Sequence, residues 1–268
     1  MRLVIKIGGS LVKEGLPDSL LSDVKAATSS HEVVIVHGGG DIVTEIATRL
    51  GKEQRFVTSP DGIRSRYTDA ETAEIYQMVM TGMVAKKLLR SLARNGVNAV
   101  SISGSDGRLL VGKRKQKLVI VDERGRKMMI DGGFTGRVDS VNGALAELLM
   151  KNGYVPLVSP VAIGEENEPL NIDGDRAAAA VAIGVGAYSV IFLTNVDGLT
   201  LDGVLVRNLS VEQAKQEIPK IGFGMQKKVI AGIEAVEGGV KEAIISSGMR
   251  PSPVQSALAH ESCTVITR

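Results

Sequence analysis

Two glycine loops and a set of charged side chains are the parts of this sequence best suited to chemistry on an anion. The loops are Lys6-Ile-Gly-Gly-Ser10 and His37-Gly-Gly-Gly-Asp41, and each follows a short run of β-branched residues. A strand that ends in glycines at the start of a helix presents free backbone N–H groups and the positive end of the helix dipole. Either loop alone is also explained as an ordinary tight turn, and neither has the spacing of a P-loop or a dinucleotide fingerprint. Two such loops in succession, one with a lysine, favour phosphate or carboxylate binding.

Two adjacent lysines stand where a helix is predicted to begin. The segment Gly222-Phe-Gly-Met-Gln-Lys-Lys-Val229 puts Lys227 and Lys228 in the first turn of that helix. Cations at the N-terminal end of a helix oppose its dipole, so a nearby anion must offset the unfavourable interaction. A local conflict of this kind is typical of functional sites.

Two further segments hold more polar groups than their local structure needs. Asn171, Asp173 and Asp175 alternate in front of an alanine-rich helix, and a single N-cap residue would be enough for that helix. A surplus carboxylate there is suited to hold lysines or to position a metal near phosphates. Thr194-Asn-Val-Asp-Gly198 ends an apolar strand, where it forms either a simple turn or a contact for the base and ribose of a nucleotide.

Basic residues gather in two other segments. Arg64 and Arg66 project from a predicted loop, and guanidinium groups are suited to bidentate carboxylate binding. A hairpin is predicted over residues 108–130, with its turn at Glu123-Arg-Gly125. Its basic residues are Arg108, Lys113, Arg114, Lys115, Lys117, Arg124, Arg126 and Lys127, against only Asp122 and Glu123. The hairpin is therefore either a solvated surface element or a basic flap beside an anionic substrate or acidic partner.

Apolar runs alternate with helical patterns along most of the chain, which is typical of an α/β protein with a parallel sheet covered on both faces. Strands are predicted near residues 2–7, 33–36, 97–103, 155–161, 189–194, 242–246 and 263–267. Helices are predicted near residues 17–29, 41–50, 70–95, 140–152, 175–185, 210–216, 226–237 and 253–259. In such sheets ligands bind at the carboxyl ends of the strands, where both glycine loops fall. A polar break near residues 164–170 predicts one lobe over residues 1–165 and a second over residues 166–268.

Composition argues against several classes of protein. Aromatic residues make up only 3% of the chain, Trp is absent and the net charge is +2, so a nucleic-acid partner is not expected. The one cysteine, Cys263, lies in an apolar run that predicts burial, and the three histidines lack metal-ligand spacing, so no metal centre is expected. No apolar stretch reaches membrane-spanning length and the first strand leaves no room for a signal peptide, so we expect a cytoplasmic protein without a membrane partner.

Taken together, these segments resemble the amino acid kinase family, and within it the N-acetylglutamate kinase branch. The resemblance covers essentially the whole chain and rests on five ordered segments, which are Lys6-Ile-Gly-Gly, His37-Gly-Gly-Gly, Gly62-Ile-Arg64, Asn171-Ile-Asp-Gly-Asp175 and Gly224-Met-Gln-Lys-Lys228. It implies an α/β fold, a three-layer αβα sandwich with a mainly parallel central sheet. It also implies ATP-dependent phosphorylation of a side-chain carboxylate to an acyl phosphate, with Mg2+ delivered on the ATP.

The resemblance also implies a role for each matching residue. Lys6 and Lys228 would flank the transferring phosphoryl group and Asp175 would hold both lysines, with Lys227 ranked behind Lys228. The implied acceptor contacts are Gly39, Gly40, Arg64 and Asn171. The implied nucleotide contacts are Gly8, Gly9, Thr194, Asn195, Asp197, Gly198, Gly224 and Met225, and backbone N–H groups of the two glycine loops would bind phosphate oxygens.

The chain departs from the N-acetylglutamate kinases in two places. Gly62-Ile-Arg-Ser-Arg-Tyr-Thr68 replaces a shorter Gly-Leu-Arg-Val-Thr stretch and adds Arg66, and Asp173 replaces an asparagine of the family pattern. The Arg-Ser-Arg-Tyr-Thr-Asp stretch resembles the archaeal branch that acts on amino acids tethered to the C-terminus of the acidic LysW carrier protein. That branch serves lysine biosynthesis through aminoadipate and often arginine biosynthesis through glutamate. The resemblance thus implies an acidic carrier as partner, for which the basic hairpin would be a docking element.

Two alternatives stay open. One is a plain N-acetylglutamate kinase of arginine biosynthesis. The other is a non-catalytic nucleotide-binding regulator on the same fold, against which the joint presence of Lys6, Asp175 and Lys228 argues. Arginine-inhibited hexameric relatives carry an N-terminal extension that has no counterpart here, so a homodimer without arginine feedback is expected. The choice between aminoadipate and glutamate also stays open, because one methylene is worth only about 1–3 kcal/mol in a pocket.

Overall fold

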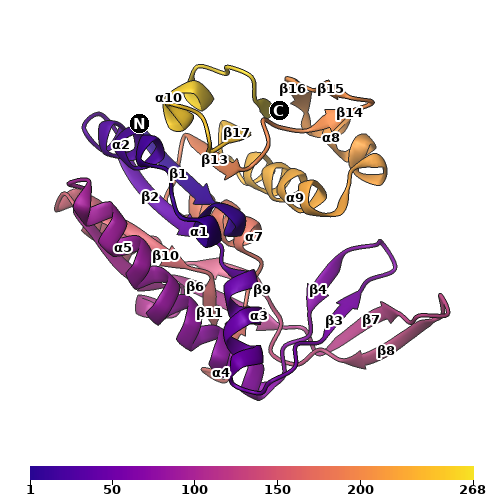
Figure 1. The fold of residues 1–268 in the computed structure, drawn as a ribbon. Coiled ribbons are helices and arrows are strands. Elements are labelled where there is room, and N and C mark those ends of the chain that lie inside the picture. The colour runs from indigo at the N-terminus through magenta and orange to yellow at the C-terminus, as the bar shows by residue number, and fades with distance from the viewer.

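One eight-stranded sheet organises the chain from Met1 to Arg268 in the computed structural model (Figure 1). The strands, in sheet order, are β16 (Asn208–Ser210), β18 (Thr264–Thr267), β17 (Glu242–Ser247), β13 (Ser189–Thr194), β1 (Arg2–Ile7), β2 (Glu32–His37), β10 (Val155–Ser159) and β5 (Ala99–Ser103). All neighbours run parallel except β17 and β18, which are antiparallel. The predicted α/β class and mainly parallel sheet are confirmed, although β16 was not predicted.

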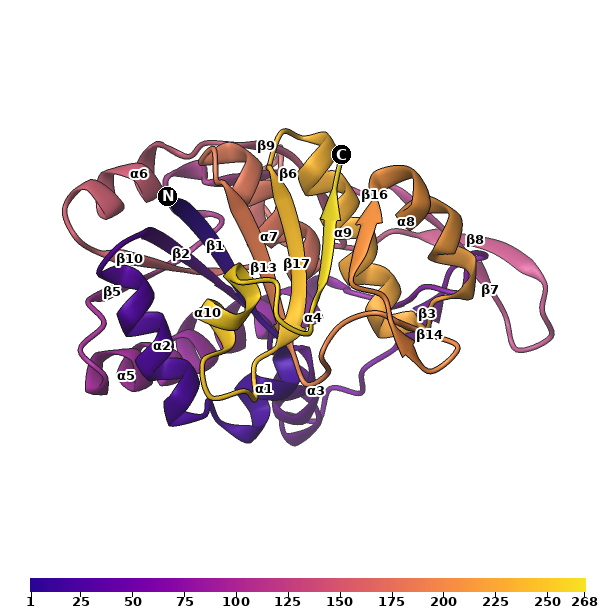
Figure 2. The same cartoon turned by 90° about the horizontal axis from the view of Figure 1, so that it is seen from above.

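The strands are nearly continuous apolar runs because both faces of the sheet are buried. Val4 and Val34 pack into the core on one face, while Ile5 and Ile35, their neighbours in sequence, pack into the core on the other. Cys263 is buried just before β18, as its apolar surroundings predicted. Figure 2 looks along the layers and shows the strands side by side between the helices.

A layer of helices covers each face of the sheet and completes the predicted sandwich. One face packs against α6 (Ala144–Lys151), α7 (Gly174–Gly184), α8 (Val211–Glu217) and α9 (Phe223–Glu237). The other packs against α1 (Gly9–Glu14), α2 (Asp18–Thr28), α3 (Gly40–Arg49), α4 (Ala70–Gln77), α5 (Ala85–Arg94) and α10 (Pro253–Leu258). A π-helical segment, Met78–Val84, joins α4 to α5 inside the long predicted helix. None of the helices is both long and apolar enough to cross a bilayer.

Smaller β elements extend from the sandwich. A four-stranded sheet has the order β12 (Pro169–Asn171), β11 (Val161–Ile163), β6 (Leu110–Arg114), β9 (Gly136–Val141). Three hairpins are formed by β3 (Phe56–Thr58) with β4 (Arg64–Arg66), β7 (Lys117–Val121) with β8 (Lys127–Asp131), and β14 (Thr200–Leu201) with β15 (Val204–Leu205). The β3–β4 and β7–β8 hairpins lie next to each other at one end of the molecule (Figure 1).

Further details of secondary structure differ from the prediction. Arg64 and Arg66, for which a loop was predicted, lie on β4 because that segment pairs with β3. The predicted hairpin over residues 108–130 is only partly present: β7 and β8 pair around the predicted turn, but β6 pairs with β9 and β11 instead. The helix predicted from residue 140 begins at Ala144, because the residues before it pair with β6 as β9. The short helix α1 was not predicted, since it starts on the glycines themselves.

Candidate active site

Lys6, Asp175 and Lys228 meet at the carboxyl edge of the sheet. The Asp175 carboxylate lies between two ammonium groups, with Oδ1 2.6 Å from Lys6 Nζ and Oδ2 3.2 Å from Lys228 Nζ. The three side chains are only 6%, 7% and 13% exposed for Lys6, Asp175 and Lys228 respectively. Burial alone would raise the pKa of Asp175, but the two lysines outweigh burial and lower it. Burial and the nearby charge of Lys6 lower the pKa of Lys228. Two cations share one carboxylate here, so the cluster is suited to an added anion.

β1, α7 and α9 bring this cluster together. Lys6 is the penultimate residue of β1, which lies between β2 and β13 in the sheet. Asp175 stands in the first turn of α7, where the Asp173 side chain caps the helix by accepting bonds from the N–H groups of Asp175 at 3.0 Å and Arg176 at 3.2 Å. The predicted single cap and surplus carboxylate are thereby identified as Asp173 and Asp175.

The two lysines of α9 engage different carboxylates. Lys228 pairs with Asp175, while Lys227 Nζ lies 3.2 Å from Asp173 Oδ2 and over the ring of Phe223. Because α9 begins at Phe223, three residues earlier than predicted, both lysines lie in its second turn rather than its first. The dipole argument therefore weakens, since that effect fades within the first turn. Burial of Lys228 beside Lys6 is the stronger sign of an anion site.

The two glycine loops touch each other through their backbones. A Cβ atom on Gly38 would lie 2.8 Å from the backbone nitrogen of Gly9, and one on Gly9 would lie 3.2 Å from that of Gly39. Gly9 and Gly40 are the first residues of α1 and α3, so their N–H groups have no acceptor inside their own helices. The N–H group of Gly8 differs from the expectation, because it donates to the carbonyl of Leu193 at 2.9 Å.

Arg66, rather than Arg64, reaches the second glycine loop. Its guanidinium is buried, donates to the carbonyl of Gly40 at 2.7 Å and to Thr44 Oγ1 at 2.9 Å, and has no carboxylate partner. Burial lowers its pKa. Arg64 is exposed and lies over the ring of Phe56, 4.6 Å from its centre. The family segment Gly62-Ile-Arg64 had pointed to Arg64, and the structure places Arg64 on the surface and Arg66 against the second glycine loop.

Asn171 lies beside Thr68, which follows β4. Its side-chain amide donates to Thr68 Oγ1 at 2.9 Å, and its backbone N–H donates to the carbonyl of Phe134 at 2.9 Å. The carbonyl of Thr68 in turn accepts a bond from the N–H of Phe134 at 2.6 Å. Hydrogen bonds thus connect Phe134, at the base of the β7–β8 hairpin, to Thr68, which follows β4, and to Asn171.

The residues expected on the nucleotide side stand at a strand end and a helix start. Thr194 ends β13 and is buried, and Asn195 and Asp197 follow it on the surface. Asp197 also forms an ion pair with Arg250 at 2.9 Å. Gly198 has a packing role, because a Cβ there would lie 2.5 Å from a side-chain oxygen of β18. Gly224 and Met225 lie in the first turn of α9, and the space around Gly224 is open.

His37 forms a buried support beneath the second loop that sequence reasoning did not identify. Its Nδ1 lies 3.0 Å from the Gly38 carbonyl and its Nε2 lies 2.9 Å from Ser159 Oγ, whose hydroxyl lies 3.3 Å from the Met80 carbonyl of the π-helical segment. Burial lowers the pKa of His37 to about 4, so the imidazole is neutral near pH 7. Ser159 lies 122 residues from His37, so no local pattern predicts this link.

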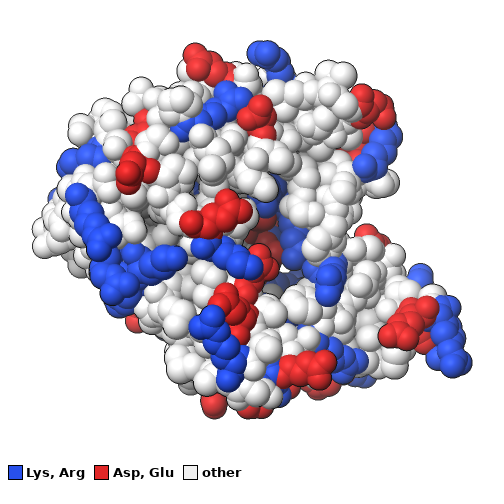
Figure 3. Space-filling view, viewed as in Figure 1, with Lys and Arg blue, Asp and Glu red and all other residues white.

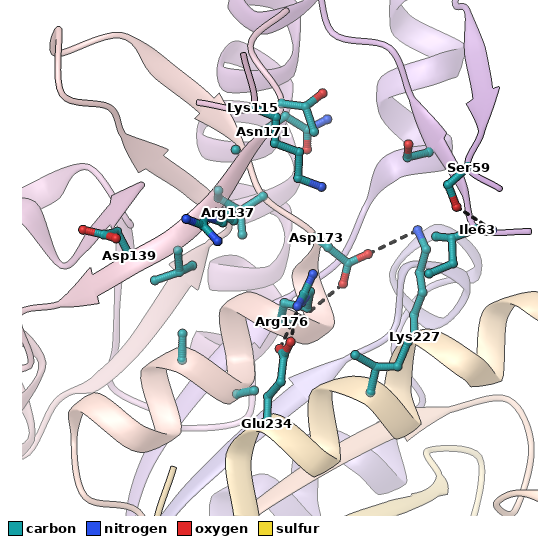
Figure 4. A pocket seen from close by; sticks show the side chains of 18 of the residues that line it. Ser59, Ile63, Lys115, Arg137, Asp139, Asn171, Asp173, Arg176, Lys227 and Glu234 are labelled. Carbon is teal, nitrogen blue, oxygen red and sulfur yellow. Dashed lines mark hydrogen bonds and ion pairs between the residues drawn. The ribbon is translucent and has the colours of Figure 1, made fainter. Parts of the chain in front are cut away.

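A cavity of about 830 Å³ opens beside these residues, between the two hairpins and helices α7 and α9. Figure 3 shows the molecule hollowed between α9 and the hairpins, with Lys and Arg side chains gathered in the hollow. Asn171, Asp173 and Lys227 line the cavity together with Arg66, whereas Arg64 does not. Figure 4 shows the side chains of Asn171, Asp173 and Lys227 around this space. Lys6, Asp175 and Lys228 do not line the cavity themselves, but Asp173, which does, stands two residues before Asp175.

Comparison with known proteins identifies the family. A LysW-aminoadipate/LysW-glutamate kinase of Saccharolobus islandicus is 45% identical over 257 residues, which are 96% of this chain and 96% of its own length. A protein of Cenarchaeum symbiosum named for the same activity is 54% identical over 264 residues, 98% of each chain. The structure of N-acetylglutamate synthase from Neisseria gonorrhoeae matches the whole chain with 59% of its own length, a TM-score of 0.80 and 22% identity, which shows a shared fold. The model of the amino acid kinase family matches residues 1–247, and this chain belongs to that family.

Proposed function

We propose that this protein uses ATP to phosphorylate a side-chain carboxylate to an acyl phosphate, on 2-aminoadipate or glutamate linked to a LysW-type carrier. Relatives named for this activity at 45% and 54% identity over nearly the full chain support the substrate class. The observation that carries the chemistry is the Asp175 carboxylate held between Lys6 and Lys228, next to two glycine loops in backbone contact.

The cluster supplies charge stabilisation rather than covalent or base chemistry. An oxygen of the acceptor carboxylate attacks the γ-phosphorus, and the bond to the bridging oxygen breaks so that its electron pair leaves on ADP. A carboxylate is already ionised at pH 7, so no general base is needed. Lys6 and Lys228 neutralise the charge that develops on the phosphoryl oxygens, and Asp175 keeps both lysines in position. This is the division of roles that the sequence predicted.

The backbone geometry suits the phosphates of ATP. The loops approach so closely at Gly9 and Gly38 that side chains have no room, which leaves the N–H groups at the starts of α1 and α3 accessible to phosphate oxygens. Both oxygens of Asp175 are engaged by lysines, so Mg2+ would be held mainly by the phosphates and by water. When bound, Mg2+ neutralises charge on the phosphates. We assign the nucleotide to residues 166–268, with Thr194, Asn195, Asp197, Gly198, Gly224 and Met225 nearest to it.

The acceptor side is assigned to residues 1–165 together with Asn171. The buried guanidinium of Arg66 has only neutral partners, so a substrate carboxylate would give it a charged one. Asn171 faces the same cavity. We assign Gly39 and Gly40, at the start of α3, to contacts between the acceptor and the phosphates. We therefore assign to Arg66 the carboxylate contact that the family resemblance had implied for Arg64.

An acidic carrier fits the charge of the β7–β8 hairpin. Lys117, Arg124, Arg126 and Lys127 are exposed on it, and among them only Arg126 forms an ion pair, with Asp122. Complementary charge of this kind raises association rates and weakens with salt. We further propose that the enzyme is cytoplasmic and that it forms a homodimer. Light scattering on the purified protein measures its mass and so tests the homodimer.

The decisive experiment measures ADP release with three acceptors: LysW-linked aminoadipate, LysW-linked glutamate and free N-acetylglutamate. Carrier-linked substrates are expected to be turned over with the higher kcat/KM. Efficient turnover of N-acetylglutamate alone would instead support an N-acetylglutamate kinase. ATP binding without ADP release from any acceptor would support a non-catalytic regulator.

The site assignment is tested by Lys228→Ala. Loss of one charge-stabilising group is expected to lower kcat by about 100- to 1000-fold while the protein stays folded. Lys220→Met is the matched control, because Lys220 is exposed and pairs only with Glu217 on the surface. Unchanged turnover by Lys228→Ala, with circular dichroism and unfolding temperature as in the wild type, would refute the assignment.

A further inference from the structure

Two cations that face the large cavity have no carboxylate partner. Lys115 follows β6 and Arg137 belongs to β9, and both line the cavity next to Asn171 and Asp173. Neither side chain takes part in any ion pair or hydrogen bond of the structure, and Figure 4 draws no dashed line from either of them. The Lys115 side chain is half-buried, so its charge is partly removed from water.

Four carboxylates line the cavity, and three of them are engaged elsewhere, while Asp61, in the turn between β3 and β4, forms no ion pair. Glu165, Glu166 and Glu168 line a neighbouring hollow with Lys115 and Arg137, and none of them forms an ion pair with either cation. Asp173 pairs with Lys227, Glu234 binds Arg176, and Asp139 pairs with a lysine of β6 at 2.8 Å. The pKa of Lys115 is lowered by burial first and next by the charge of Arg176. An unpaired, partly desolvated cation among other cations is unfavourable on its own, and a bound anion would offset it.

This location is separate from the phosphoryl-transfer cluster. Lys6 and Lys228 share Asp175, whereas Lys115 and Arg137 stand on the four-stranded sheet and face the cavity from the hairpin side. A cavity of about 830 Å³ belongs to the size range that encloses a drug-sized ligand, which leaves room beyond an amino acid.

We propose that Lys115 and Arg137 form a second anion subsite, which binds a carboxylate on the acyl or peptidyl group attached to the amino nitrogen of the acceptor. The inference rests on the proposed function and adds a specificity determinant to it. An N-acetyl group carries no carboxylate and leaves the subsite unfilled, whereas a peptidyl group with a free carboxylate fills it. Substrate choice is then decided partly inside the cavity, in addition to any contact with the surface of the carrier.

The test uses a matched pair of small acceptors, N-succinyl-aminoadipate and N-butyryl-aminoadipate. The two have acyl chains of the same length, and only the succinyl chain ends in a carboxylate. The wild-type enzyme is expected to prefer the succinyl compound in kcat/KM by about 10- to 100-fold, as expected for a charge-assisted contact. Lys115→Met keeps the shape of the side chain without its charge and is expected to bring this ratio close to one. Arg137→Gln is expected to lower the ratio less, because Arg137 is the more exposed.

Lys220→Met is the control, since Lys220 is exposed and pairs only with Glu217 on the surface. It is expected to keep the wild-type ratio. Calorimetric titration of both compounds without ATP gives a second readout, so binding preference is measured even if neither compound is phosphorylated. Preference in binding without turnover would retain the subsite, and turnover of the carrier-linked acceptors would then decide the proposed function. Equal affinity and equal kcat/KM for the two compounds in the wild type, or a ratio that Lys115→Met leaves intact, would refute the subsite.

Discussion

Arg64 and Arg66 lie two residues apart and both lie over the ring of Phe56, yet they differ in burial and in hydrogen-bond partners. Arg66 is buried against the carbonyl of Gly40, and Arg64 is exposed over Phe56. If Arg66 binds the acceptor carboxylate, Arg66→Lys loses the planar two-point contact and is expected to raise KM for the acceptor by about 10- to 100-fold. Arg64→Lys is expected to change KM less than threefold. Steady-state kinetics with the acceptor varied at saturating ATP measures both, and the reverse pattern would return the assignment to Arg64.

Sequence reasoning at the residue scale singled out two residues that the structure brings together. Asp175 stood out as a carboxylate beyond the one N-cap that α7 requires, whereas the argument that singled out Lys228 placed it one helical turn too early. His37 and Lys115 did not stand out in this way. Their significance comes from burial and from partners far along the chain, such as Ser159, which no local spacing reveals.

The two glycine loops act as one unit at the scale of elements. A Cβ at Gly38 would meet the Gly9 nitrogen at 2.8 Å, and both atoms are held by backbone that cannot move away freely. Gly38→Ala is therefore expected to lower the free energy of unfolding by about 1–3 kcal/mol and to raise KM for ATP. Gly82→Ala is the control, because Gly82 is helical and has open space around it. Urea unfolding and ATP kinetics give both values, and a Gly38→Ala enzyme with wild-type KM for ATP would remove the loops from the phosphate site.

The β7–β8 hairpin gives a second prediction for a single element. Lys117→Glu combined with Lys127→Glu reverses two exposed charges, and is expected to lower kcat/KM for a carrier-linked acceptor by about 10-fold or more at low salt. Kinetics with free N-acyl acceptors should not change, because these contact only the cavity. Lys86→Glu combined with Lys87→Glu makes the same charge change on exposed α5 and serves as control. Equal losses from the two double variants would show a general charge effect rather than docking.

Helices and strands were predictable where the hydrophobic period was clear. They were not predictable where a segment becomes a strand only because it pairs with a distant strand. The buried strands β1, β2 and β13 are continuous apolar runs, which two-sided burial requires. The last two residues of β9, Ser140 and Val141, were read as the start of a helix because their pairing with β6 depends on residues that lie well upstream in the chain. The π-helical segment has no such pattern of its own, and two of its residues, Met80 and Val84, lie against Gly39.

At the scale of the whole molecule, the sheet joins the two proposed lobes along one pair of strands. Residues 1–165 supply β1, β2, β5 and β10, residues 166–268 supply the other four strands, and β1 pairs with β13 through five consecutive residues. Lys6 lies on β1, at this junction of the two proposed lobes. Asp175, from the second lobe, forms ion pairs with Lys6 and with Lys228. The general rule that ligands bind at the carboxyl ends of parallel strands predicted this location. It did not predict that the break near residue 165 falls in the turn between β11 and β12, which pair with each other.

The stability of the whole molecule should report the buried state of His37. Its pKa is lowered from 6.5 to about 4 by burial, so between these pH values the unfolded chain binds a proton at His37 and the folded protein does not. Stability therefore falls as pH drops through this window, by about 3 kcal/mol in total at 1.36 kcal/mol per pKa unit. His37→Gln is expected to remove this slope, whereas His31→Gln is expected to keep it. Urea unfolding from pH 7 to pH 4.5 measures the slope, and parallel curves for the wild type and His37→Gln would show that His37 is protonated without loss of structure.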